Sequence, residues 1–152
     1  MGKNKTKSSA VSNALSKDQI TLKRAIKHYS PRGVTDEQIQ KMSPFYKKGD
    51  TLFFGTVEGN CVLILQIAKD NYVGKKLSLK RLVNASGTND ITILCDAIYR
   101  MSGTKISQKE ALKIKPFYKR GGVVIYGYPM GYNVIVTRIQ KGVCETGKVS
   151  FK

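Results

Sequence analysis

The sequence SPFYKKGDTLFFG at residues 43–55 returns 72 positions later as KPFYKRGGVVIYG at residues 115–127. At this offset residues 18–80 align with residues 90–152 without a gap, and 19 of the 63 aligned positions are identical. That is about 30%, whereas unrelated segments of ordinary composition would agree at about 6% of positions. The identities run along the whole alignment, so the sequence predicts two copies of one structural module.

The repeat divides the chain into a basic tail (1–17), a first module (18–80), a link (81–89) and a second module (90–152). A module of roughly 65 residues is close to the smallest size that buries a stable core on its own. We therefore expect the two modules to pack against each other.

Each module is expected to open with two helices. Apolar residues at helical spacing predict the first helix of each module: Leu22, Ala25, Ile26 and Tyr29, then Leu94, Ala97, Ile98 and Met101. Capping boxes predict where helices begin: Ser16 with Gln19, Thr35 with Gln38, and Ser107 with Glu110. Pro44 and Pro116 are expected to end the second helix of each module at the residue before them, or to start a further turn.

The rest of each module has the pattern of strands. TLFFGTVEGNCVLILQIAK (51–69) and VVIYGYPMGYNVIVTRIQK (123–141) each predict a β-hairpin, and KLSLK (76–80) and KVSFK (148–152) predict a short third strand. Pro129 indicates that its strand lies at a sheet edge or ends early. The predicted fold class is α+β, with two tandem copies of a helix–helix–β-hairpin–strand module. Two helices before a hairpin are also compatible with a winged-helix-like topology.

The chain carries a formal net charge of +17, to which both modules contribute. Such a chain attracts polyanions, of which nucleic-acid backbones are the commonest, or it is rich in lysine for solubility alone. The positions of the charges separate these interpretations. Each module holds 11 Lys and Arg residues, and if these were placed at random about two of them would occupy aligned positions in the two modules. Six pairs coincide: Lys41/Lys113, Lys47/Lys119, Lys48/Arg120, Lys69/Lys141, Lys76/Lys148 and Lys80/Lys152. A cation that meets a phosphate must keep its position, whereas one that serves solubility need not.

These twelve matched cations form the predicted nucleic-acid site, together with Tyr46 and Tyr118. Each tyrosine is either a core residue with a hydrated hydroxyl or an exposed platform for base stacking. The PFYKK and PFYKR segments are expected at the end of the second helix, before the hairpin. The alternative interpretation is a solvated helix C-terminus, where cations interact favourably with the helix dipole in any case.

The N-terminal tail carries Lys3, Lys5 and Lys7 in polar sequence, and a basic arm of this kind adds non-specific affinity for nucleic acid. Gly2 and Thr6 also match a lipidation motif, although the lysine directly after Gly2 disfavours it. The tail lacks the apolar stretch of a secretory signal, and no apolar run is long enough to span a membrane. We expect an intracellular protein of the cytoplasm, the nucleoid or the nucleus, or a component of a virion.

The sequence offers little material for catalysis or metal binding. His28 is the only histidine, and no phosphate-binding loop, nucleophile elbow or metal-binding motif is present. Cys61, Cys95 and Cys144 have neither the spacing of a zinc site nor matching positions in the two modules. We expect no catalytic residue, no metal and no cofactor.

The favoured function is therefore non-enzymatic nucleic-acid binding. DNA is favoured over RNA because no RNP-type aromatic motif is present and a helix pair before a hairpin suits a duplex groove. One alternative is a structural component of a nucleoprotein particle (virion, nucleoid or ribosome), in which self-association would play a part. Another is a module that binds a protein partner or a membrane surface.

Overall fold

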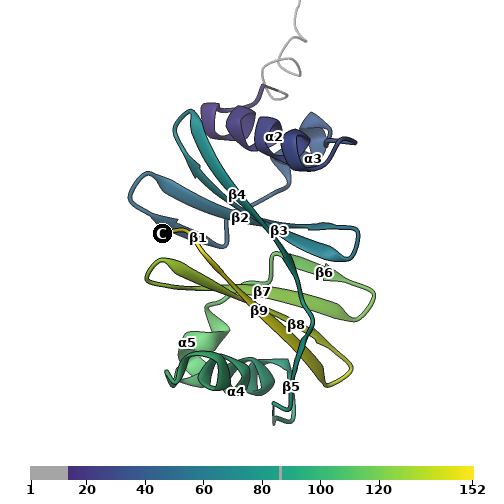
Figure 1. Cartoon of the computed structure of the whole chain (residues 1–152), viewed down its shortest axis with the longest axis vertical. Coiled ribbons are helices and arrows are strands. Elements are labelled where there is room, and N and C mark those ends of the chain that lie inside the picture. Colours follow the sequence, from purple (N-terminus) through teal and green to yellow (C-terminus); the bar gives the residue numbers. More distant parts are fainter. Residues whose placement is uncertain (1–13, 86) are drawn as a thin grey trace, which may run out of the picture.

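The computed structural model describes residues 14–85 and 87–152, which form four helices and nine strands. The strands make two antiparallel sheets that pack face to face, and a pair of helices covers the outer face of each sheet (Figure 1). The protein is therefore a mixed α+β fold with four layers in the order helix, sheet, sheet, helix.

The first sheet and its helices come from the first half of the chain. The helices are α2 (Lys17–Tyr29) and α3 (Asp36–Gln40). The strands are β1 (Tyr46–Lys48), β2 (Thr51–Glu58), β3 (Cys61–Ala68) and β4 (Asn71–Ser78). They lie in the sheet in the order β1-β2-β3-β4, and each connects to the next through two residues.

The second sheet has one more strand. Strand β5 (Arg81–Val83) comes first and is followed by helices α4 (Asp90–Ser102) and α5 (Gln108–Leu112). The remaining strands are β6 (Tyr118–Arg120), β7 (Val123–Met130), β8 (Asn133–Gln140) and β9 (Val143–Ser150). The sheet order is β5-β9-β8-β7-β6, so β5 lies at the edge beside β9. The bounds of α5 and of β6 to β9 lie 72 residues after those of α3 and β1 to β4.

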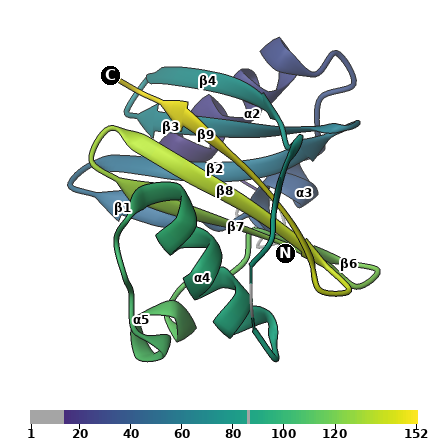
Figure 2. The same cartoon turned by 60° about the horizontal axis from the view of Figure 1, so that its bottom comes forward.

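The helices bury the faces that the apolar spacing predicts. Leu22 and Ala25 of α2, like Leu94 and Ala97 of α4, are fully buried against their sheets. The three predicted capping boxes are present at the starts of α2, α3 and α5. Figure 2 shows α4 and α5 in front of the second sheet, with α2 and α3 behind the first.

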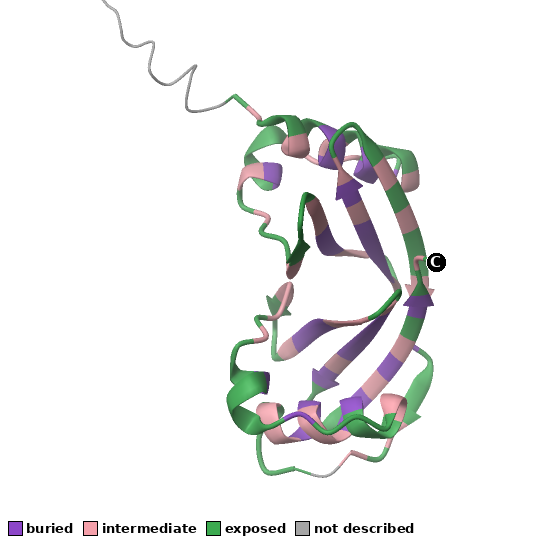
Figure 3. Ribbon diagram, turned by 90° about the vertical axis from the view of Figure 1, so that its left-hand side faces the viewer, coloured by how far each residue is buried: buried purple, intermediate pink, exposed green. Residues whose placement is uncertain are grey.

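The central strands β3 and β8 are buried on both faces. In β3, Leu63 and Leu65 pack under α2, whereas Val62 and Ile64 belong to the core between the sheets. Figure 3 shows the result, with buried residues on the strands and on the sides of the helices that face the sheets. The fold thus has two helix–sheet cores and one sheet–sheet core.

Phe45 and Phe117 tie the two sheets together by reciprocal contacts. A Cβ atom at Gly55 would lie 2.7 Å from the ring of Phe117, and a Cβ atom at Gly127 would lie 2.7 Å from the ring of Phe45. The centroids of the two rings are 5.5 Å apart. Each ring therefore lies against the backbone of a strand in the opposite sheet, an approach that requires glycine. This contact explains why both copies of the repeated phrase contain the same phenylalanine and glycine.

The expected position of the PFYK segments at a helix end is wrong. Helix α3 ends at Gln40, and Tyr46–Lys48 form strand β1 paired with the start of β2. A proline such as Pro44 disfavours helical backbone at the residue before it, and Gly49, at φ 60°, then turns the chain back on itself. The second half repeats this arrangement in β6, so the cations of both segments lie on strands.

Two further expectations need adjustment. The third strand of each half is eight residues long, because a two-residue turn after β3 or β8 starts the pairing at once. The segment expected only to link the modules contributes β5 to the second sheet. The strand with Pro129 is neither an edge strand nor short, because β7 lies between β6 and β8 and continues to Met130. The expectation holds only locally, since β6 pairs only with Val123–Ile125 and leaves β7 without a neighbour on that side at Pro129.

Candidate nucleic-acid interface

Three matched cations meet at one end of the first sheet. Lys48 pairs with Thr51, which in turn pairs with Ala68, the residue before Lys69. Lys47 and Lys69 also line one surface pocket. We call Lys47, Lys48 and Lys69 the first cationic end.

The second sheet has the same arrangement. Arg120 pairs with Val123, which pairs with Gln140, the residue before Lys141. Lys119 precedes Arg120 on strand β6. We call Lys119, Arg120 and Lys141 the second cationic end.

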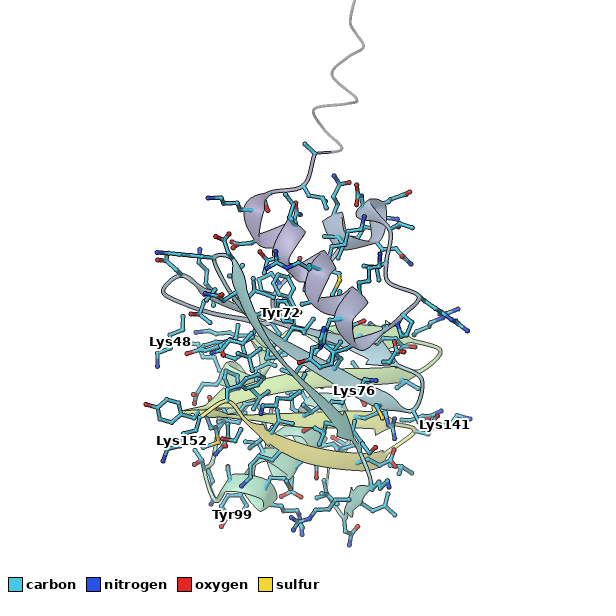
Figure 4. All side chains as sticks on the ribbon, turned by 45° about the horizontal axis from the view of Figure 1, so that its top comes forward. Lys48, Tyr72, Lys76, Tyr99, Lys141 and Lys152 are labelled. Atoms are coloured by element: carbon cyan, nitrogen blue, oxygen red, sulfur yellow. The ribbon has the colours of Figure 1, made fainter. Side chains whose placement is uncertain are left out.

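The two cationic ends lie on opposite sides of the sheet pair. In Figure 4 Lys48 and Lys141 project to opposite sides of the molecule, and Lys152 lies on the side of Lys48. The side of Lys48 therefore carries the C-terminus as well as the first cationic end (Figure 1). The matched cations make two separate surfaces and not one continuous patch.

The matched cations are available to a ligand. All twelve are exposed. Among the residues that the structure describes, only Lys41 of the twelve forms an ion pair, with its Nζ 3.8 Å from an Oε of Glu37. The charges of both cationic ends are therefore not neutralised by direct ion pairs within the described part of the chain.

The two ends differ in the acidic residues around them. The pocket that holds Lys47 and Lys69 is also lined by Asp18 and Asp50. At the second end the turn residue corresponding to Asp50 is Gly122. We therefore expect the second cationic end to have the more positive potential.

Lys69 and Lys141 occupy an unusual backbone conformation. Both have positive φ, 55° and 50°, in the two-residue turns after β3 and β8. Glycine or asparagine suits this region better than lysine does, because a Cβ atom crowds the following carbonyl oxygen. Turn geometry alone therefore does not account for a lysine at this position in both halves.

The other matched cations are not joined to the cationic ends. Lys41 and Lys113 cap the C-termini of α3 and α5 in the helical layers. Lys76 on β4 and Lys148 on β9 pair with Leu63 and Ile135, and Lys148 borders a pocket beside Met101. Lys80 and Lys152 lie two residues after the ends of β4 and β9. Lys3, Lys5 and Lys7 lie outside the residues that the structure describes.

Tyr46 and Tyr118 are half-buried and pack against the core between the sheets. The ring centroid of Tyr46 is 5.6 Å from that of Phe53. Neither ring is an open platform, so any contact with a ligand would use the edge that remains accessible.

The most exposed aromatic residue was not singled out from the sequence. Tyr132, at 69% exposure, lies in the turn between β7 and β8 and borders a cavity of about 120 Å³ between the sheets. Lys48 and Phe151 border the same cavity. The counterpart of Tyr132 in the first half is Asn60, so a comparison of the two halves does not single Tyr132 out. Only its position in a turn next to a glycine indicates that its side chain is exposed.

The ionisable groups with shifted pKa values are structural. Burial raises the pKa of the Cys144 thiol to about 11, with Asp96 and Glu145 adding to the shift. Burial also raises the pKa of Cys95 and that of Tyr126. No group of three His, Cys, Asp or Glu side chains in the described ranges could hold a metal ion. None of these groups lies in either cationic end.

Comparisons with known proteins add no assignment. No protein-family model matches the chain, and neither the curated proteins nor the solved structures contain one that is significantly similar to it. Within the described residues, no helix combines the length and the apolar character needed to cross a bilayer.

Proposed function

We propose that this protein binds nucleic acid through its two cationic ends and has no enzymatic activity. The observation that supports this most is the placement of the matched cations. Three of them gather at each of two sheet ends, all are exposed, and none of these six forms an ion pair within the described residues. Clustered, unneutralised cations of this kind bind phosphate backbones.

The proposal includes an internal duplication. Aligned identities at one offset, matching strand bounds and the reciprocal contacts of Phe45 with Gly127 and of Phe117 with Gly55 all support it. A duplicated unit would give each half the same phosphate-binding end. Two such ends on one molecule would bind one polymer with higher avidity than either end alone.

The binding elements that we propose are strand ends and turns. A recognition helix of a winged-helix protein lies in the major groove, whereas α3 and α5 are only five residues long. We therefore do not retain a winged-helix mode of binding. DNA remains the favoured ligand over RNA, because the sequence has no RNP-type motif of stacking aromatics.

The opposite placement of the two ends favours a second candidate, a structural component of a nucleoprotein particle. A chain with Lys48 on one side and Lys141 on the other could bridge two segments of nucleic acid (Figure 4). Bridging would make long duplexes sediment together at low protein concentration, whereas a simple binder would coat them individually.

A comparison of two charge variants tests the proposal. The first variant replaces four matched cations by alanine: Lys47, Lys48, Lys119 and Arg120. The control variant removes the same charge from exposed cations without a counterpart in the other half: Lys27, Arg32, Lys105 and Lys109.

Affinity for a labelled random-sequence duplex is measured for both variants by fluorescence anisotropy at low salt. We expect the matched variant to lose about tenfold or more in affinity and the control variant to lose much less. The melting temperatures of both should stay close to that of the wild type, because the replaced side chains are exposed. Equal losses in the two variants would contradict the proposal, and so would failure of the wild-type protein to bind either the duplex or a single strand of the same sequence.

A further inference from the structure

The cavity between the sheets beside Lys48 has the composition of a base-binding pocket. Its walls include Tyr46, Lys48 and Gln66 from the first sheet, and Tyr132, Asn133 and Phe151 from the second half of the chain. We propose that this cavity binds the base of one unpaired nucleotide in single-stranded nucleic acid. This inference rests on the proposed function and specifies the form of nucleic acid that it concerns.

The size of the cavity fits a base. A water molecule needs about 10–15 Å³ of such space. The volume of about 120 Å³ is roughly ten times this minimum, so the cavity can admit a group much larger than a water molecule, such as a single pyrimidine ring. A base stacked and paired in a duplex cannot enter such a space, so the nucleotide must be unpaired.

Aromatic rings supply the stacking surfaces. Phe53 also lines the cavity, where it is buried, and its ring meets the ring of Phe151 edge to face with centroids 5.5 Å apart. Tyr46 lies 5.6 Å from the same Phe53 ring and stays half-buried. Tyr132 stands at the rim, largely exposed, where it can stack on an entering base without losing other contacts.

Two amides supply polar groups that a base edge can use. Gln66 and Asn133 each offer a donor and an acceptor, as the Watson–Crick edge of a base does. The structure records no hydrogen bond from either side-chain amide to another described residue. Half-buried amides of this kind gain hydrogen bonds when a polar ligand enters.

The charge at the rim fits the phosphate that accompanies a base. Lys48 borders the cavity, and none of the lining residues is acidic. The backbone N–H of Phe151 donates to the carbonyl oxygen of Tyr132 at 2.7 Å, which fixes the C-terminal segment beside the cavity. Lys152 follows directly and lies on the same side of the molecule as Lys48 (Figure 4).

The other half of the chain does not carry the same groups. The counterparts of Tyr132, Asn133 and Gln66 are Asn60, Cys61 and Arg138. Arg138 is engaged by Glu145, with its Nε 2.9 Å from a carboxylate oxygen. We therefore expect one base-binding site for each chain, although both ends bind phosphates.

Binding of two probes of equal charge tests the inference. A fluorescein-labelled oligothymidylate is compared with an abasic phosphodiester of the same length, both titrated with the full chain at the same salt concentration. Stacking of one base predicts that the oligothymidylate binds at least about fivefold more tightly. Tyr132→Ala should remove most of this preference, and Tyr132→Phe should keep it.

Tyr99→Ala provides the matched control, because Tyr99 is also an exposed tyrosine, at 44%, but lies on α4 and lines a different pocket (Figure 4). This variant should keep the wild-type preference. NMR gives a second readout, since the side-chain amide resonances of Gln66 and Asn133 should shift when oligothymidylate is added and stay in place with the abasic probe.

The outcomes separate the inference from the proposed function. Equal affinity for the two probes, an unchanged preference in Tyr132→Ala, or amide resonances that do not respond to oligothymidylate would overturn the inference while phosphate binding stands. Failure of the wild-type protein to bind either probe or a duplex would overturn both.

Discussion

Replacement of Gly55 by alanine tests the contact that holds the two sheets together. The new Cβ atom would lie 2.7 Å from three carbon atoms of the Phe117 ring, about an ångström closer than ordinary van der Waals contact. The ring cannot move away freely, because it packs against Phe45 with ring centroids 5.5 Å apart. Overpacking of this kind costs about 1–3 kcal/mol. For a domain of this size each kcal/mol lowers the melting temperature by about 2–4 °C, so we expect a loss of about 2–12 °C.

A double-mutant cycle with Phe117→Ala isolates the contact. Phe117→Ala removes the ring and destabilises the protein on its own, but Gly55→Ala should then cost nothing further because the clash is gone. The free energy of unfolding, measured by urea titration of the four proteins, should show a coupling of about 1–3 kcal/mol.

Gly74→Ala is the control for this cycle. Its Cβ atom would lie 2.2 Å from the ring of Tyr29, beneath α2, so this variant is also destabilised. Its effect should add to that of Phe117→Ala, because Tyr29 and Phe117 pack against separate cores. Additive behaviour of Gly55→Ala and Phe117→Ala would refute the reciprocal contact.

Three further predictions follow from individual residues. Lys141→Gly should relieve the backbone strain at φ 50° and raise the free energy of unfolding by about 1 kcal/mol, while weakening duplex binding. A fall in melting temperature would contradict this account. Cys144 should resist iodoacetamide at pH 9 while Cys61 reacts, since burial raises the pKa of Cys144 to about 11 and keeps its thiol protonated. In the unfolded chain the Cys144 thiol has a pKa near 9.0, so it loses its proton at a lower pH than in the folded protein. This favours the unfolded state, so the free energy of unfolding should fall as the pH rises from about 9 to 11. Glu145→Gln should lower the free energy of unfolding by about 1 kcal/mol, because the oxygen that accepts the two hydrogen bonds from Arg138 loses its negative charge. An unchanged free energy would show that the charge of this pair contributes nothing.

The helical part of the fold could be predicted from local signals. Apolar spacing placed Leu22 and Leu94 in the core, and side-chain caps such as Ser16 with Gln19 marked helix starts. These signals depend on neighbours within one or two turns, which a single sequence contains.

Strands β1 and β6 could not be predicted with the same rules. Their lysine and arginine residues have low strand propensity, and the proline before each segment is equally compatible with the end of a helix. The packing of layers on both faces of the first sheet is indicated by the sequence of β3. The run CVLILQIA is apolar on both faces, as expected of a strand that is covered on both sides.

The cavity beside Lys48 depends on how the two sheets meet. Its walls combine Tyr46 from β1 with Tyr132 from the turn after β7, which are 86 residues apart in the sequence. Nothing in the sequence around Tyr46 or Tyr132 indicates that these two residues line one cavity. Tyr46 has a tyrosine counterpart, Tyr118, in the second half, whereas Tyr132 has no tyrosine counterpart in the first half. The matched positions of the cations were visible in the alignment, but their division into two ends required the strand register.

The salt dependence of duplex binding tests the central claim most directly. Each phosphate contact contributes about 0.9 to the slope of log affinity against log salt concentration. If Lys47, Lys48, Lys119 and Arg120 contact phosphates, their replacement by alanine should reduce the magnitude of the slope by about 3–4 relative to the wild type, while the control variant should reduce it by much less. A slope that is the same in the wild type and the matched variant would contradict the account.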